Sequence, residues 1–212
     1  MPSFIEVNCL VALLHESIMF KPEYRVGFLV LKREIGLLPT LRIVISAILK
    51  SFKIDAESEQ IDDKTNKTKT RIKNYFKLLA LMYERLQRQY GRDCSNEIMQ
   101  KVLMEGGQVF FRGFKPLRLN DDLTDFTKIY KNFESNNIVF DVIEESEQRF
   151  EIVIRRCLIY ESFIELGLED LSKWMCDIAF NYFSNYHPRM KYIKDRMIAR
   201  GDDTCHEVFI WE

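Results

Sequence analysis

The chain has 212 residues, of which 47% are hydrophobic and 30% are charged, the composition of an ordinary soluble globular protein. This length suits one substantial domain, or one domain with a helical extension. The formal net charge of -1 argues against a general nucleic-acid binder, because such a protein needs a basic face to displace counterions.

The first twenty residues, "MPSFIEVNCLVALLHESIMF", do not read as a secretion signal. They carry an acidic residue where basic ones are expected, and they lack a small-residue cleavage site. The most apolar stretch, residues 36–52, is interrupted by Pro39 and Arg42 and is too short to span a bilayer. We therefore expect a cytoplasmic protein with reduced cysteines and no membrane span.

Residues 1–52 are predicted to form a helical N-terminal extension. In the second half of this segment, apolar residues recur at helical spacing, at Leu41, Val44, Ile45, Ile48 and Phe52. Two interpretations stay open: a helix packed on the core of the protein, or a helix that binds a membrane surface or a partner.

Residues 53–70 are polar and nearly free of apolar side chains, which predicts a linker. A long helix is predicted to follow and to end at Gly91, because glycine suits the left-handed position after a helix. Asp93 is a candidate N-cap for the next helix. A further short helix is predicted over residues 122–134.

From residue 137 onward the apolar residues alternate with polar ones, which is typical of strands. "NIVFDVIEESEQRFEIVIRRC" predicts two strands joined by a tight polar turn. A helix is predicted over 168–186, and a second hairpin around Gly201-Asp202-Asp203. The order predicts an α+β fold with a helical N-terminal half and a C-terminal small antiparallel sheet of two hairpins with packed helices. The α+β domain is assigned to residues 71–212.

Three of the five cysteines fall in the last quarter of the chain: Cys157, Cys176 and Cys205. They lie at a strand end, within a helix and at a strand start, so we expect them to converge on one pocket. No CxxC pair is present to indicate a compact zinc site. The bland alternative is that each thiol is a small buried hydrophobe, as we expect for Cys9 and Cys94.

The segment "RRCLIYESFIELGLEDLSKWMCDIAFNYFSNYHPRMKYIKDRMIARGDDTCHEVFIW" resembles the C-terminal signature of the L-2-amino-thiazoline-4-carboxylic acid hydrolase-like family. The matching elements in chain order are Cys157, Glu161, Leu166-Gly167, Cys176-Asp177, Gly201-Asp202 and Cys205. Upstream, "YERLQRQYGRDCSNEIMQ" resembles the family's helix that ends in a glycine and is followed by a second helix. The resemblance covers roughly residues 70–212.

The resemblance implies a small-molecule hydrolase that opens a cyclic amidine-like thiazoline to an N-carbamoyl amino acid. A thiolate can attack the ring if a neighbour lowers its pKa, a carboxylate can hold an amidinium or act as base, and an arginine fork suits a carboxylate. The candidates for catalysis are Cys176, Asp177, Cys157 and Cys205, and those for substrate binding are Arg155, Arg156, Glu161 and His206. On this interpretation Cys176→Ser should abolish activity.

The hydrolase interpretation needs no cofactor and implies a small-molecule substrate, no nucleic acid and no membrane span, and it leaves a homo-oligomer open. One alternative is a metal- or small-ligand-binding sensory module of the 4-vinyl-reductase type without catalysis. In that case zinc would be held by Cys157, Cys176, Cys205 and His206. Another alternative is an interaction or scaffold domain with buried cysteines. Asp177 would then be a surface partner of Lys173, and His206 a satisfied strand residue.

Overall fold

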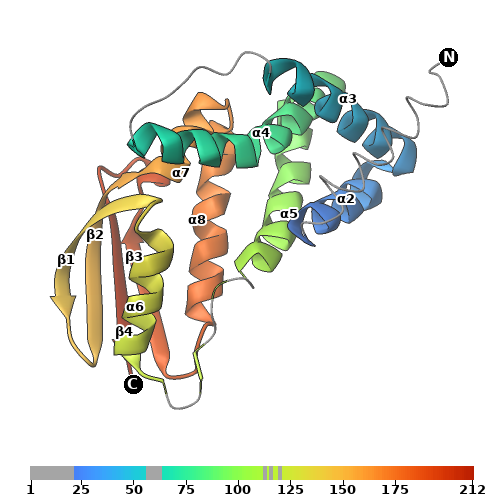
Figure 1. The fold of residues 1–212 in the computed structure, drawn as a ribbon. Coiled ribbons are helices and arrows are strands. Elements are labelled where there is room, and N and C mark those ends of the chain that lie inside the picture. Colours follow the sequence, from blue (N-terminus) through green and yellow to red (C-terminus); the bar gives the residue numbers. More distant parts are fainter. Residues whose placement is uncertain (1–21, 56–63, 112–113, 115–116, 119–120) are drawn as a thin grey trace.

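The computed structural model describes residues 22–55, 64–111, 114, 117–118 and 121–212. Its helices and strands form two adjoining parts, a layered sheet-and-helix part and a helical part (Figure 1). Helix α8 lies between the sheet and the helical part (Figure 1). The fold is α+β, as the sequence predicts.

Four helices make up the helical part: α2 (Pro22–Ile35), α3 (Leu37–Asp55), α4 (Lys64–Tyr90) and α5 (Arg92–Phe111). The predicted helix boundary at Gly91 is confirmed, since this residue has φ +79° between α4 and α5. Helix α5 already begins at Arg92, so Asp93 lies in its first turn and is not the N-cap. At this boundary the predicted helix end was accurate to about one residue.

The structure corrects the predicted linker at both of its ends. Helix α3 continues to Asp55 and α4 begins at Lys64, so both helices extend into residues 53–70. Lys69 and Lys73 of α4 form ion pairs with Glu165, which helps to explain how so polar a stretch is held as a helix. Residues 56–63 lie outside the described part of the chain.

The C-terminal half contains one antiparallel sheet with the strand order β1-β2-β4-β3. Its strands are β1 (Ile138–Glu145), β2 (Arg149–Cys157), β3 (Met190–Arg196) and β4 (Cys205–Trp211), so both predicted hairpins are confirmed. The second connection is longer than a tight turn and contains a short 3-10 helix, Ile198–Arg200.

Helices α6 (Leu123–Glu134) and α8 (Glu169–Ser184) lie on the inner face of the sheet, and Asp122 closes a capping box at the start of α6 (Figure 1). A third helix, α7 (Leu158–Glu165), was not predicted. It begins directly where β2 ends, with Cys157 as its N-cap. The sequence therefore contains neither a turn residue nor a common capping residue that would indicate the start of this helix.

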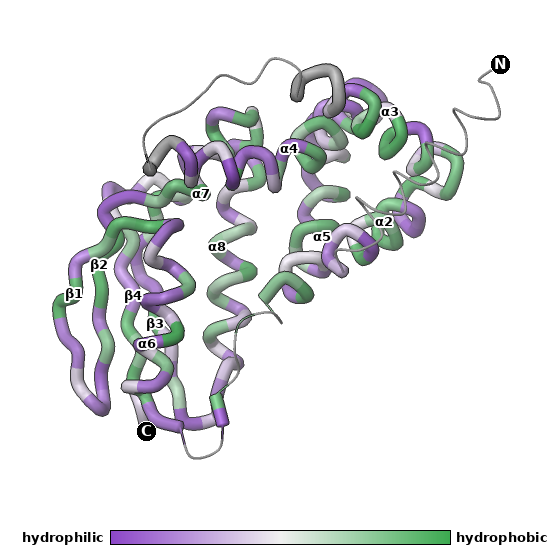
Figure 2. Tube along the Cα trace, viewed as in Figure 1, coloured by the Kyte–Doolittle hydropathy of each residue, from purple (hydrophilic) through white to green (hydrophobic). Residues whose placement is uncertain are grey.

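The core is continuous from the sheet to the helical part. Phe150, Ile152 and Ile154 of β2 and Phe209 of β4 point inward and are buried, while the intervening residues point outward. Helices α5 and α8 approach so closely that a Cβ atom on Gly107 would lie 2.6 Å from Ile178 Cδ1. Figure 2 shows green, hydrophobic segments along the facing sides of these elements.

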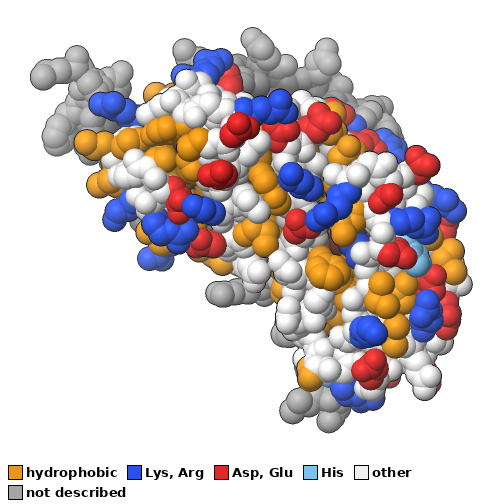
Figure 3. Space-filling model, turned by 180° about the vertical axis from the view of Figure 1, so that it is seen from behind, with side chains coloured by type: hydrophobic (Ala, Val, Ile, Leu, Met, Phe, Trp, Pro, Cys, Tyr) orange, Lys and Arg blue, Asp and Glu red, His pale blue; other side chains and the backbone are white. Residues whose placement is uncertain are grey.

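The outer surface mixes charges of both signs. On the face drawn in Figure 3, blue and red side chains alternate over most of the described residues, without a broad basic surface. Among the described helices, none is long and apolar enough to cross a bilayer.

Candidate functional site

A cavity of about 640 Å³ lies between the inner face of the sheet and helices α4, α5, α6, α7 and α8. Cys157, Cys176 and Cys205 all line it, which confirms that these three cysteines converge on one pocket. Each comes from a different place in the fold: the end of β2, the middle of α8 and the start of β4. This volume falls within the range of about 300–1,000 Å³ that is typical of small-molecule sites.

Two of the three thiols, those of Cys157 and Cys205, accept hydrogen bonds from backbone N–H groups. Cys157 Sγ accepts a hydrogen bond from the backbone N–H of Tyr160 at 3.4 Å, and thereby caps α7. Cys205 Sγ accepts one from the backbone N–H of Ile198 at 3.3 Å. Both contacts fix the thiols in the structure.

Burial raises the pKa of each of the three thiols, and it raises that of Cys157 to about 12. The charge of Lys194 opposes this shift at Cys176 and Cys205 without reversing it. The cysteines are therefore protonated at neutral pH, and a protonated thiol is a weak nucleophile and a poor metal ligand.

The same cavity contains charged residues that were not predicted. Lys194 of β3 and Glu207 of β4 form an ion pair at 2.8 Å, and each side chain is 5% exposed. The other oxygen of Glu207 accepts a hydrogen bond from the hydroxyl of Tyr130 at 2.8 Å. Burial alone would lower the pKa of Lys194, but the charge of Glu207 outweighs it and raises the pKa well above its usual value. Lys194 is therefore a fixed cation in the cavity wall.

Glu134, the last residue of α6, is the second carboxyl group of the cavity. Burial, together with the negative charge of Glu207, raises the pKa of Glu134 to about 7, while Lys194 and a hydrogen bond from Asn137 oppose the shift. Its Oε2 atom is inaccessible to solvent and has no hydrogen-bond partner among the described residues. A carboxyl group in this state exchanges protons near neutral pH.

Arg71 and Asn74 of α4 line the cavity and are exposed, so its wall reaches the solvent beside α4. We find no hydrogen bond or ion pair between Arg71 and any other described residue. Its guanidinium is thus available to bind an anionic group that enters the cavity.

Asp177, which the sequence analysis proposes as a catalytic residue next to Cys176, does not line the cavity. Its carboxylate accepts a hydrogen bond from Arg200 at 2.6 Å and is partly exposed. Asp177 therefore forms a surface ion pair. Its partner is Arg200, and not Lys173 as the sequence suggested. Lys173 instead lies over the ring of Trp174, at 5.1 Å from its centroid.

The four nominated substrate-binding residues also lie outside the cavity lining. Arg155 is paired with Asp141 at 2.7 Å, and Arg156 is paired with Glu161 at 2.8 Å. His206 follows the inward-facing Cys205 on β4, so its side chain is on the opposite face of the sheet.

On that outer face His206 lies between two carboxylates. Its Nδ1 is 2.7 Å from Asp195 and its Nε2 is 2.9 Å from Glu151. Of the four residues proposed to hold zinc, His206 therefore lies on the outer face of the sheet, whereas the three cysteines line the cavity on the inner face. Among the described residues, no group of three or more His, Cys, Asp or Glu side chains is arranged to hold a metal ion. Cys94 is exposed, contrary to expectation, and Cys9 lies outside the described residues.

No curated protein matches the chain. Among solved structures, the Fe(II) unliganded H-NOX protein from K. algicida is 10% identical with a TM-score of 0.36, over 90% of this chain and 95% of that one. A structure used to study H-NOX activation is 13% identical with a TM-score of 0.35, over 88% and 93%. An oxygen-bound H-NOX domain related to soluble guanylate cyclases is 15% identical with a TM-score of 0.28, over 88% and 92%. These TM-scores are too low to establish a common fold.

The family comparison gives a clear result. The model of one family, described as L-2-amino-thiazoline-4-carboxylic acid hydrolase, matches residues 49–209. The match includes α4 to α8 and all three cavity cysteines, and it begins within α3, earlier than the segment in which the sequence motifs lie. This chain therefore belongs to the L-2-amino-thiazoline-4-carboxylic acid hydrolase family.

Proposed function

We propose that this protein is a small-molecule hydrolase that opens a cyclic amidine-like ring, with Glu134 as the general base that activates water. The observation that carries the proposal is the carboxyl group of Glu134, which lines the cavity and has one buried oxygen without a partner among the described residues. A free acceptor oxygen in such a place can take the proton of a bound water.

The reaction follows from the groups that line the cavity. Glu134 takes a proton from water as the water oxygen forms a bond to the amidine carbon of the ring. The electron pair of the ring C=N bond moves to nitrogen, which takes up the remaining proton of the added water and leaves a tetrahedral intermediate with an oxyanion. As the oxyanion forms a C=O bond and the bond from this carbon to the ring heteroatom breaks, Glu134 returns its proton to the leaving atom. The net change is the addition of one water across the broken bond.

Lys194 supplies positive charge to this site. Because Glu207 and the surrounding sheet hold the ammonium in place, it needs no rearrangement to stabilise an oxyanion in the intermediate. Arg71, exposed in the cavity wall beside α4, would hold a carboxylate on the substrate, which is the role that the sequence assigned to Arg155 and Arg156.

The three cysteines have a different role in this proposal. Their burial keeps them protonated, so we assign them to the shape of the cavity, and water activated by Glu134 to the attack. This assignment favours hydrolysis without a covalent intermediate over attack by Cys176.

Turnover of 2-amino-thiazoline-4-carboxylate and related cyclic amidines, followed by mass spectrometry, tests the proposal. Glu134→Gln should lower turnover by about 100-fold or more, which is the usual contribution of general base catalysis. Glu145→Gln is the matched control, since this exposed carboxylate pairs with Lys131 away from the cavity. Tight binding of these compounds by the wild type without any turnover would support the sensory alternative instead.

The role of Arg71 has its own comparison. Arg71→Gln should raise KM for the carboxylated thiazoline by about tenfold with little change in kcat, because a lost uniform contact affects binding alone. Arg156→Gln should leave KM unchanged, since that residue is paired with Glu161. If KM instead rose in Arg156→Gln and stayed unchanged in Arg71→Gln, Arg156 would be the residue that binds the substrate carboxylate.

A further inference from the structure

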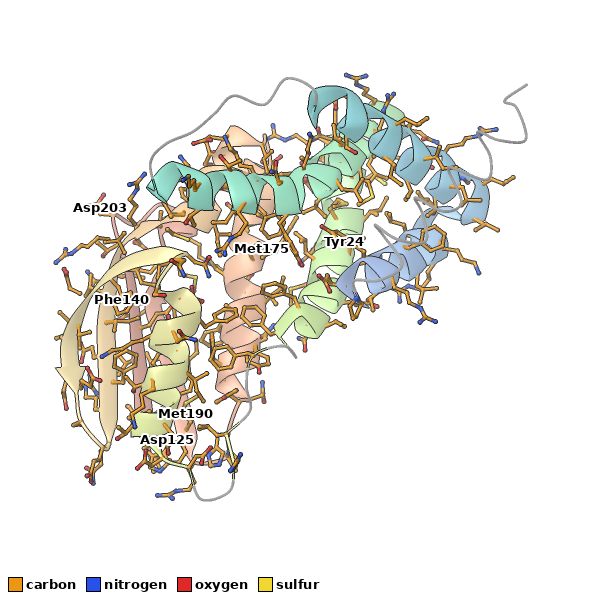
Figure 4. The ribbon with its side chains drawn as sticks, in the orientation of Figure 1. Tyr24, Asp125, Phe140, Met175, Met190 and Asp203 are labelled. Carbon is orange, nitrogen blue, oxygen red and sulfur yellow. The ribbon has the colours of Figure 1, made fainter. Side chains whose placement is uncertain are left out.

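A second cavity, of about 80 Å³, lies in the helical part among α2, α3, α4, α5 and α8. It is next to the large cavity, because five side chains line both: Tyr75, Phe76, Phe110, Phe111 and Met175. Figure 4 shows Met175 on α8, between the sheet and the helical part, and Tyr24 beyond it toward α2. The two cavities therefore follow one another along a line from the sheet to α2.

The two cavities differ in chemistry. The large one has its buried charged groups Glu134, Lys194 and Glu207 on the elements of the sheet side, α6, β3 and β4, while its other charged residue, Arg71 of α4, is exposed. The small one is lined mainly by aliphatic and aromatic side chains, including Leu31, Val44, Leu79, Met82, Val102 and Leu103. Glu23 is the one charged residue among its described lining, and it accepts a hydrogen bond from the hydroxyl of Tyr75.

We propose that the two cavities form one binding site for an amphiphilic substrate, whose amidine-like head lies against Glu134 and Lys194 and whose unbranched apolar chain extends past Met175 into the small cavity. This inference rests on the proposed function and names the substrate class. Two observations support this inference: the order of the two cavities, and the placement of the buried charges at one end.

Size and flexibility support this inference. A thiazoline carboxylate is a single small ring, much smaller than the drug-sized ligands that cavities of several hundred Å³ hold. Such a ring would leave the apolar wall facing water, whereas a chain along this wall would bury its methylene groups. The passage is lined by Met175, whose unbranched thioether adapts to a neighbour more readily than a branched side chain does.

The test measures how affinity depends on chain length. Acetamidinium, butanamidinium, hexanamidinium and octanamidinium are titrated into the full-length protein by calorimetry, at a pH above the pKa of Glu134. Affinity should rise about fourfold for each added methylene, the value for full burial of that group, until the chain fills the small cavity. If the affinity of the wild type does not depend on chain length, that result alone overturns the inference.

Two variants locate the chain. Leu78 lines the small cavity and is half-buried, so Leu78→Trp should fill it and abolish the gain of the longer amidinium ions, while acetamidinium still binds. Leu38→Trp, on an α3 side chain that is 70% exposed, is the matched control and should retain the full gain. Val44→Phe fills the same cavity from α3 and replaces Leu78→Trp if that variant does not fold. A gain that persists in a folded, filled variant would place the chain elsewhere and contradict the inference.

The outcomes for this inference and for the proposed function are distinct. If acetamidinium binds and Glu134→Gln abolishes cyclic amidine turnover, but chain length has no effect, the inference fails and the hydrolase proposal stands. If affinity rises with chain length but no cyclic amidine is hydrolysed, the amphiphile site stands and the hydrolase proposal fails.

Discussion

The ammonium of Lys194 lies 2.8 Å from Glu207 Oε1, where both side chains are almost completely excluded from solvent. The two residues come from neighbouring strands and are partners in the antiparallel register of β3 and β4. A buried pair of this kind rarely adds much stability over two apolar side chains, because desolvation of both charges offsets their attraction. Its presence in the cavity wall is therefore better explained by function than by folding.

The loss of one partner should be costly. Lys194→Met leaves the charge of Glu207 buried without its cation, although the hydrogen bond from Tyr130 stays, and should lower the free energy of unfolding by about 3–5 kcal/mol. Urea unfolding measures this change. The double variant Lys194→Met, Glu207→Gln should recover a large part of it. A loss below about 1 kcal/mol in the single variant would mean that the pair is solvated in solution.

The raised pKa of Glu134 predicts a stability that depends on pH. Between about pH 4.5 and 7 the folded protein keeps this proton and the unfolded chain does not, so stability falls as pH rises. The fall should be on the order of 3 kcal/mol and should be complete above about pH 7. Glu134→Gln should lack this component, and Glu145→Gln should retain it. Urea unfolding across this range would contradict the assignment if the wild type and Glu134→Gln had parallel curves.

His206 predicts a second pH effect on the outer face of the sheet. Burial lowers its pKa, but hydrogen bonds to Glu151 and Asp195 outweigh burial, so the net shift is upward. The imidazolium therefore stabilises the fold fully below its unfolded pKa, and this contribution is lost as pH rises through the folded pKa. His206→Gln should be less stable than the wild type near pH 6 and should approach it at higher pH. NMR titration of the imidazole would contradict this if the pKa were below 6.5.

Asp177 should have little influence on stability or activity. Its ion pair with Arg200 is on the surface, where such pairs contribute about 0–1 kcal/mol. Asp177→Asn should therefore shift the melting temperature by a few degrees at most and leave turnover intact. A large loss of turnover in a folded Asp177→Asn variant would restore the catalytic role suggested by its position beside Cys176.

The fold could be predicted wherever periodicity was strong. The alternation of Phe150, Ile152 and Ile154 fixed the inward face of β2, and the left-handed position of Gly91 fixed a helix boundary. Helix α7 was missed because it follows β2 without a turn and has a cysteine in place of a common N-cap. The first turns of α4 were missed because their support comes from a distant residue, Glu165, and not from local propensity.

The candidate site was predictable in part. The convergence of the cysteines followed from the positions of Cys157 and Cys205 at strand ends and of Cys176 within the helix between those strands in the chain. The signal for Lys194 and Glu207 was present but not used: Lys194 shares a strand face with Met190 and Tyr192, and Glu207 shares one with Cys205 and Phe209. A charge on an otherwise apolar strand face indicates a buried pair or a site. The state of Glu134 depends on tertiary burial, although its place at the end of α6, where the helix dipole disfavours a negative charge, offered a hint.

The pH dependence of cyclic amidine turnover, measured for the wild type and for Cys176→Ser, tests the central claim most directly. If Glu134 is the base, kcat should rise with pH through an apparent pKa of about 7 and then level, and Cys176→Ser should keep this profile with turnover within about tenfold. Two results together would contradict the account and make Cys176 the nucleophile. The profile would rise only above pH 9, where the buried thiol ionises, and Cys176→Ser would lose turnover.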